Sequence, residues 1–231
     1  HSTQDVALVV HGDDFMATGS DAHVEDVRKM LSDKYKITSD ILGPSGGQVQ
    51  DLKILNRIVR WCRDGLRLEA DPRHAELVVR HYDRGGGRAV KTAGVKAPKR
   101  KDEEPEIDDD KVLLNPEEAR EHRGIAARLN YLCVDRADCQ YSTKELARTM
   151  AAPTRGDTAK GKRIARYLLG RPRAALFYPW QDETAVLTAF TDSDWAGCPT
   201  SRKSTSGAVL MRGQHLLKSY SRQQRTIALS S

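Results

Sequence analysis

Two adjacent carboxylates, Asp13 and Asp14, interrupt an apolar stretch close to the start of the chain, directly after Gly12. Neighbouring side chains on a flat strand point to opposite faces, so the two acids converge only where the chain turns, and glycine permits that turn. Converged carboxylates repel unless a cation lies between them, and hard divalent cations prefer oxygen ligands. Residues 5–16 therefore predict a hairpin whose tip could hold Mg²⁺ or Mn²⁺ for phosphoryl chemistry. Aspartate and glycine are also common turn residues, so an ordinary turn is the alternative.

Two further acidic residues lie at the end of a strand that is predicted much later in the sequence. Val186–Thr191 reads as a short strand that ends in Asp192, with Asp194 two residues further on. On an ideal strand the two carboxylates would share a face. The alternative is that both are turn residues in front of Trp195.

These segments resemble a known family when they are taken in order. Residues 9–15 resemble the Tyr-x-Asp-Asp hairpin of the reverse transcriptases in copia-type retrotransposon polyproteins. Residues 192–198 and 202–207 resemble the start of the RNase H domain of the same elements, and residues 127–132 and 162–168 are similar to the segment between the two activities. Each motif alone is weak or moderate, whereas their order and spacing match across nearly the whole chain.

The resemblance implies an α+β fold, with part of a reverse-transcriptase palm, thumb and connection followed by an incomplete RNase H-like mixed sheet. It implies a palm end and primer-holding hairpin over 1–84, a flexible charged linker over 85–115, a helical thumb and connection segment over 116–180, and a truncated RNase H-like domain over 181–231.

The resemblance also assigns roles to the acidic residues. Asp13 and Asp14 would be catalytic metal ligands of the polymerase, with Asp13 the principal one, and Asp192 would be the first metal ligand of the RNase H. The family has a further polymerase Asp upstream and an RNase H Glu downstream, so we expect the chain to be a piece of a longer polyprotein. The family usually has Tyr where this chain has His11.

An excess of basic residues favours a nucleic-acid partner. The formal net charge is +6 and the isoelectric point is about 9.2, which suits an anionic partner. A hairpin tip is predicted at 54–57, and a basic helix face lies within 155–173. Both could contact nucleic acid. The alternatives are that the hairpin tip only packs in its sheet and that the basic helix face is only solvated. The candidate nucleic-acid contacts are Leu55, Asn56, Arg57, Lys160, Lys162, Arg163, Arg166, Arg202 and Lys203.

Cysteine spacing and hydropathy exclude several other classes. The four cysteines form no Cys-x-x-Cys pair, which argues against a zinc site and a secreted disulfide framework. No run approaches the roughly 20 apolar residues of a membrane span. These absences agree with the resemblance, which implies an intracellular protein in a cytoplasmic particle or the nucleus.

The function implied by the resemblance is RNA-directed DNA synthesis with cleavage of the hybrid RNA. The expected partners are an RNA template, a DNA primer, their hybrid and dNTP substrates, with no membrane. One alternative is a catalytically inactive nucleic-acid-binding remnant of a decayed element. Another is a cellular scaffold protein that uses the basic helix as a partner surface.

Periodicity and capping residues predict the elements that would position these side chains. We expect a helix over 22–35, strands over 52–60 and 65–70, and a helix from Pro72. Further helices are predicted to begin with an Asn115 cap, a capping box at Ser142–Glu145 and an Asp157 cap. The last strands are expected at 186–191, 207–212, 215–220 and 226–229.

Overall fold

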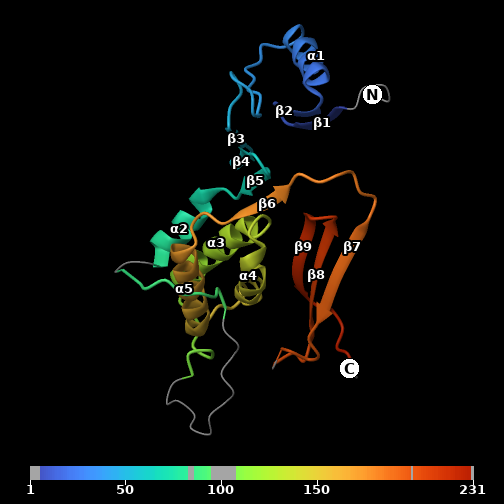
Figure 1. Ribbon diagram of the computed structural model, residues 1–231. Coiled ribbons are helices and arrows are strands. Elements are labelled where there is room, and N and C mark those ends of the chain that lie inside the picture. Colours follow the sequence, from blue (N-terminus) through green and yellow to red (C-terminus); the bar gives the residue numbers. More distant parts are fainter. Residues whose placement is uncertain (1–5, 83–85, 95–107, 199, 230–231) are drawn as a thin grey trace. The chain divides into compact units, whose positions relative to one another are not determined.

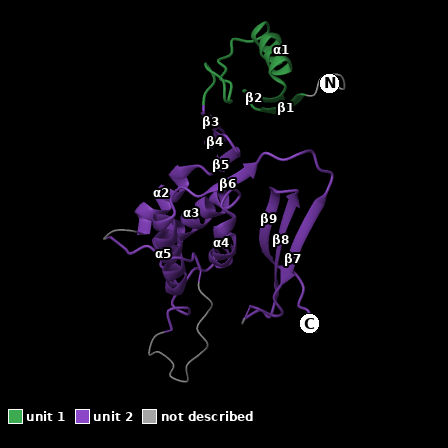
Figure 2. Ribbon diagram, viewed as in Figure 1, with its two compact units in different colours: residues 1–49 green, residues 50–231 purple. Residues whose placement is uncertain are grey.

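A computed structural model describes residues 6–82, 86–94, 108–198 and 200–229 of the chain (Figure 1). The chain divides into two compact units, His1–Val49 and Gln50–Ser231 (Figure 2). The described residues form five α-helices and three antiparallel sheets.

The first unit consists of one hairpin and one helix. Strand β1 (Val6–His11) pairs with β2 (Asp14–Gly19), as the apolar runs predicted, and α1 (Asp21–Ser32) follows. The helix ends three residues before Tyr35, whose ring instead stacks on Phe15 with 6.1 Å between centroids. Among the described residues of this unit, no apolar side chain is fully buried.

A four-stranded sheet begins the second unit. Strands β3 (Asp51–Ile54), β4 (Arg57–Cys62), β5 (Gly65–Glu69) and β6 (Ala175–Pro179) lie in that order. The strand expected over 52–60 is divided into β3 and β4 by a turn, at the place where a hairpin tip was predicted at 54–57. The predicted β4–β5 hairpin is confirmed. The sequence analysis missed β6, which joins the sheet from a distant part of the chain (Figure 1).

Four helices enclose the hydrophobic core of this unit. They are α2 (Pro72–Tyr82), α3 (Pro116–Leu132), α4 (Gln140–Ala147) and α5 (Arg155–Gly170), and a short 3₁₀ turn at Ala137–Cys139 precedes α4. Their apolar faces bring together fully buried side chains that include Val78, Ala126, Leu129, Leu146, Ile164 and Leu168.

The helix starts agree with the sequence only in part. Asn115 caps α3 in a capping box with Glu118, as predicted. For α5 the cap is Thr154, and Asp157 is the third-position partner of its capping box, so the Asp157 cap is wrong. The capping box at Ser142–Glu145 is also wrong, because α4 starts earlier and contains these residues.

The last sheet contains β7 (Leu187–Ser193), β8 (Thr205–Arg212) and β9 (His215–Gln223). All three strands were predicted within a few residues, whereas the strand expected at 226–229 is absent, since that segment has no strand structure. Hydrogen bonds from Tyr178 of β6 to Leu216 and from Gln140 of α4 to Ser219 connect β9 with the rest of the unit.

The charged linker expected at 85–115 is only partly described. Residues 86–94 lie along α5, where the Val90 N–H donates to Arg166 and Ala93 is buried. Residue 85 and most of the acidic run, residues 102–107, lie outside the described part of the chain.

Candidate metal and nucleic-acid sites

The adjacent acids of the first unit lie at the tip of the β1–β2 hairpin. His11 pairs with Asp14, so Gly12 and Asp13 form a two-residue turn. Gly12 has a φ of +62°, a left-handed conformation that glycine adopts without steric cost. Both carboxylates are exposed. The tip therefore presents two neighbouring oxygen donors to solvent on a hydrogen-bonded hairpin.

The donor chemistry at this tip suits a magnesium ion, although its donors are few. Carboxylate oxygens are the ligands that Mg²⁺ prefers, and an exposed tip leaves room for water and substrate oxygens. Within the described ranges, no three His, Cys, Asp or Glu side chains gather closely enough to hold a metal. A metal ion at this tip would need further ligands besides Asp13 and Asp14.

Asp192 and Asp194, the acids at the end of the predicted strand, have different surroundings. Asp192 lies on β7 opposite Gly207 and its side chain is exposed. Asp194 lies just beyond the strand, and its carboxylate accepts a 2.5 Å hydrogen bond from the Thr205 N–H. Asp194 therefore holds the loop after β7 in place, and Asp192 is the carboxylate left available for a ligand.

The loop between β7 and β8 is held in an unusual backbone conformation. Ala196 and Arg202 have φ values of 49° and 56°, a region that non-glycine residues rarely adopt. The buried Ser204 hydroxyl accepts from the Ala196 N–H, and the Arg202 guanidinium lies 5.6 Å from the centre of the Trp195 ring. The exposed Arg202 side chain is thus directed onto a ring, while Lys203 is half-buried.

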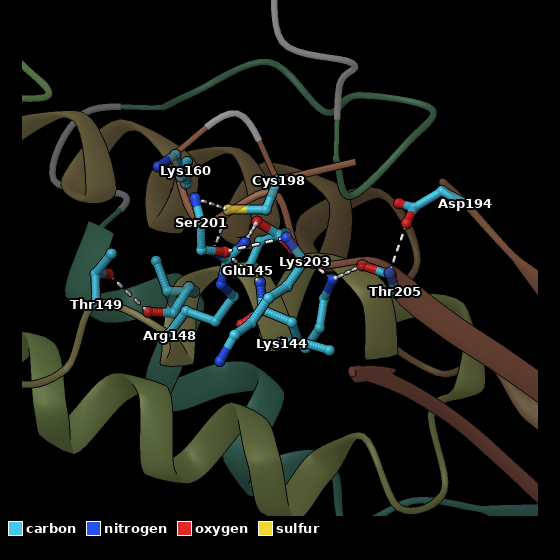
Figure 3. A network of polar contacts seen from close by, with 12 residues as sticks. Lys144, Glu145, Arg148, Thr149, Lys160, Asp194, Cys198, Ser201, Lys203 and Thr205 are labelled. Carbon is cyan, nitrogen blue, oxygen red and sulfur yellow. Dashed lines mark hydrogen bonds and ion pairs between the residues drawn. The ribbon is translucent and has the colours of Figure 1, made fainter. Parts of the chain in front are cut away.

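A polar network joins this loop to α4 (Figure 3). Lys144 donates to the Thr205 hydroxyl at 2.8 Å, and Arg148 donates to the Cys198 sulfur at 2.7 Å. Arg148 also pairs with Glu145. Burial raises the pKa of Cys198, but hydrogen bonds from Ser201 and Arg148 outweigh it and lower that pKa to about 6. The Arg148 guanidinium and the Ser201 contacts therefore favour the thiolate form of Cys198.

The predicted primer-holding hairpin is the β3–β4 turn. Leu55 and Asn56 have φ values of 48° and 66°, the two positive values of a type I′ turn. Leucine is an uncommon residue in this conformation. Arg57 is half-buried, with its Nε donating to Asp135 at 2.6 Å and its guanidinium 6.0 Å from the Tyr131 ring. Leu55 and Asn56 are half-buried, and Arg57 connects the turn to the end of α3.

The basic side chains of α5 make more internal contacts than a solvated face would. Lys160 pairs with Asp157 at 2.9 Å. Arg163 donates to the Thr92 hydroxyl, and Arg166 donates to the Arg88 carbonyl, so segment 86–94 occupies both. Among the described residues, only Lys162 of the four predicted contacts is exposed without such a partner.

Comparison with known proteins places the chain among retroelement proteins. It is 36% identical over 111 residues, 48% of its length, to the "Retrovirus-related Pol polyprotein from transposon RE1" of Arabidopsis thaliana. It is 34% identical over 109 residues, 47% of its length, to the "Uncharacterized mitochondrial protein AtMg00810" of the same plant, and covers 45% of that protein. It is 32% identical over 107 residues, 46% of its length, to the "Secreted RxLR effector protein 161" of Plasmopara viticola, and covers 75% of it.

The chain belongs to the copia-type retrotransposon polyproteins. The matched segment is 8% of the RE1 polyprotein, so this copia-type chain corresponds to a small part of such a protein. No family model and no solved structure matches it.

In the ranges that the structure describes, every helix is too short or too polar to cross a bilayer.

The sequence analysis missed two polar clusters of the copia-type chain. Arg136, which is 2% exposed, forms a two-point ion pair with Asp138. The Tyr167 hydroxyl donates to the same carboxylate at 2.7 Å. The second cluster consists of arginines on two neighbouring strands, Arg60 on β4 and Arg67 on β5. The alternation of these arginines with apolar residues is the sequence signal that could have identified it.

Proposed function

We propose that this chain is the part of a copia-type polyprotein that carries the end of the reverse transcriptase and the start of the RNase H domain. Its activities would be RNA-directed DNA synthesis and hydrolysis of the RNA in the RNA–DNA hybrid. The observation that carries this proposal is the similarity to the Pol polyproteins of RE1 and RE2. The exposed Asp13-Asp14 hairpin tip supports it independently, because a polymerase needs acidic oxygens that substrate phosphates can approach.

The carboxylates have distinct tasks under this proposal. Asp13 and Asp14 would hold Mg²⁺ for nucleotide addition, and Asp192 would hold it for RNA cleavage. When bound, the ion supplies charge neutralisation for the phosphoryl transfer and lowers the pKa of the attacking hydroxyl or water. The β1–β2 pairing positions the first two acids, and β7 positions the third.

The remaining contacts would orient the nucleic acid. Leu55 and Asn56, at a turn with two positive φ values, would contact the DNA primer end. Lys162, an exposed side chain of α5, would contact backbone phosphates of template or primer. Such phosphate contacts fix position without reading sequence.

Primer extension tests the polymerase assignment. The polyprotein that contains this chain would be assayed with an RNA template, a DNA primer, dNTPs and Mg²⁺, as wild type and as Asp13→Asn. We expect Asp13→Asn to reduce extension by about 10²-fold or more, because it removes a charged ligand. The matched control, Asp26→Asn, removes an exposed acid on α1 and should leave extension unchanged.

Two outcomes would redirect the proposal. Normal extension by Asp13→Asn would show that the hairpin tip is not the metal site. Salt-sensitive nucleic-acid binding by a wild-type polyprotein that extends no primer would favour the inactive remnant instead.

A further inference from the structure

The β3–β6 sheet has two chemically different faces. Across the strands, Arg60 lies opposite Arg67, and Arg67 lies opposite Phe177. Because side chains of directly paired residues share a face, these three belong to one face. The other face carries apolar neighbours such as Val59 and Leu68. Arg67 and Phe177 are exposed, so we call their side the outer face.

The outer face is hollowed around its arginines. A hollow of about 210 Å³ opens on this face. It is lined by three arginines, one acid and two apolar residues, namely Arg60, Arg67, Arg173, Glu69, Ile58 and Ala175. We name this feature the arginine hollow.

Two of the three guanidinium groups are held in fixed orientations. Arg60 donates to both carboxylate oxygens of Asp51, at 2.6 and 3.1 Å. Arg173 donates to both oxygens of Glu69, at 2.6 and 2.8 Å, and Glu69 is only 7% exposed. Each pair uses Nε and one terminal nitrogen, so the guanidinium keeps further N–H groups for a ligand. The acids thus orient these arginines without using all their donors.

Arg67 is the cation that the acids do not neutralise. Its guanidinium lies 5.7 Å from the centre of the Phe177 ring, and no carboxylate of the described residues pairs with it. It lies directly opposite Arg60, and like charges in that cross-strand position destabilise a sheet. An anion in the hollow would relieve this repulsion.

We propose that the arginine hollow binds a phosphodiester group of a nucleic-acid backbone. The planar fork of arginine matches two phosphate oxygens, and three such groups around one hollow surround a tetrahedral anion. The hollow is open, as a site for one phosphate of a long chain must be. The ligand class rests on the proposed function, whereas the site itself stands on its geometry.

Fluorescence anisotropy with the full chain tests this site without metal or catalysis. The probe is a fluorescein-labelled oligothymidylate of about 20 nucleotides, longer than the site of one small binding domain. We compare Arg67→Gln with Arg63→Gln, which removes the same charge from the exposed β4–β5 turn outside the hollow.

We expect Arg67→Gln to weaken binding roughly five- to tenfold and Arg63→Gln by less than about twofold, as direct and diffuse electrostatic contacts differ. The slope of log K against log salt should decrease by about 0.7 in Arg67→Gln, the value for one single-strand phosphate contact. Arg67→Lys should recover part of the affinity. Unchanged melting temperatures would confirm that the exposed substitutions leave the fold intact.

Two results would overturn the inference. Equal losses in Arg67→Gln and Arg63→Gln would show only diffuse attraction. Inorganic phosphate binding that Arg67→Gln abolishes, with the oligonucleotide affinity of that variant unchanged, would make the hollow a free-phosphate site. Either failure leaves the Asp13→Asn experiment unaffected, so the two proposals are judged separately.

Discussion

The two compact units bury their apolar side chains to very different degrees. Leu8, Val9 and Val10 of β1 are 43, 53 and 54% exposed, whereas Leu129 and Leu146 of the helical core are fully buried. The acids proposed for metal chemistry therefore lie on a hairpin that has strand pairing but little packing. The clusters of the second unit are instead supported by a dense core.

The hairpin acids proposed for metal chemistry and the side chains that stabilise the fold therefore lie in different units. A two-stranded ribbon is marginally stable by itself, and strands that are apolar on both faces are typical of sheets covered on both sides. Substitutions in the first unit should then alter function more than folding. Substitutions in the second unit should do the opposite, and the following experiments examine this contrast.

The largest effect is expected in the helical core. Leu129→Ala should lower the free energy of unfolding of the second unit by about 3–4 kcal/mol, because it leaves a cavity among closely packed helices. Leu8→Ala, at an exposed position, should change it by less than about 0.5 kcal/mol. Urea unfolding monitored by circular dichroism gives both values. Equal losses would show that the hairpin is part of the same cooperative unit.

The buried ion pair should rank second. Asp138→Ala leaves the guanidinium of Arg136 buried without its partner, which should cost about 2–3 kcal/mol. Tyr167→Phe removes one hydrogen bond to the same carboxylate and should cost about 1 kcal/mol. The same unfolding assay ranks them, and a larger loss in Tyr167→Phe would contradict this assignment.

A histidine in the core should make stability depend on pH. Burial lowers the pKa of His122, and it outweighs the Leu146 carbonyl and the Asp157 charge, which raise it. As the pH falls below about 6.5, the unfolded chain gains a proton that the folded chain resists, so stability decreases. The free energy of unfolding should change by at most about 1.4 kcal/mol per pH unit, the value for one proton.

Urea unfolding between pH 7.5 and 5.5 measures this dependence in the wild type and in His122→Gln. The slope should flatten in the variant. A wild-type slope that persists in His122→Gln would assign the effect to another group.

The smallest expected effect concerns Cys198. Its lowered pKa, about 6, predicts a step in thiolate ultraviolet absorbance near that pH. The step should vanish in Cys198→Ser, move to higher pH in Arg148→Gln, and persist in Cys62→Ser. The stabilisation from this thiolate–guanidinium pair is present at high pH and is lost as the pH falls through 6. A step unaffected by Arg148→Gln would remove the guanidinium as its cause.

Local signals in the sequence predicted local structure well. Asn115 and Glu118 define the start of α3 because a capping box needs only neighbouring residues. The Asp13-Asp14 hairpin was predictable for the same reason, since Gly12 and the flanking apolar strands are adjacent.

Long-range packing explains the errors. Thr143 was predicted within a capping box, but its buried hydroxyl lies 3.0 Å from the Cys133 sulfur in the middle of the packed helices. Strand β6 is short, and only its pairing with β5 identifies it. The basic residues of α5 are evident from the sequence, but it could not show that Thr92 and Arg88 contact Arg163 and Arg166.

Strand β6 is far from its partner β5 in the sequence, and this has a consequence for experiments that divide the protein into fragments. Its backbone hydrogen bonds complete an edge that β5 would otherwise expose, while α2, α3, α4 and α5 all lie between the two strands in the chain. A cleavage anywhere in that interval would leave halves that each carry an unsatisfied strand edge. Such halves should reassociate when mixed, which would make this sheet a natural reporter for split-protein complementation.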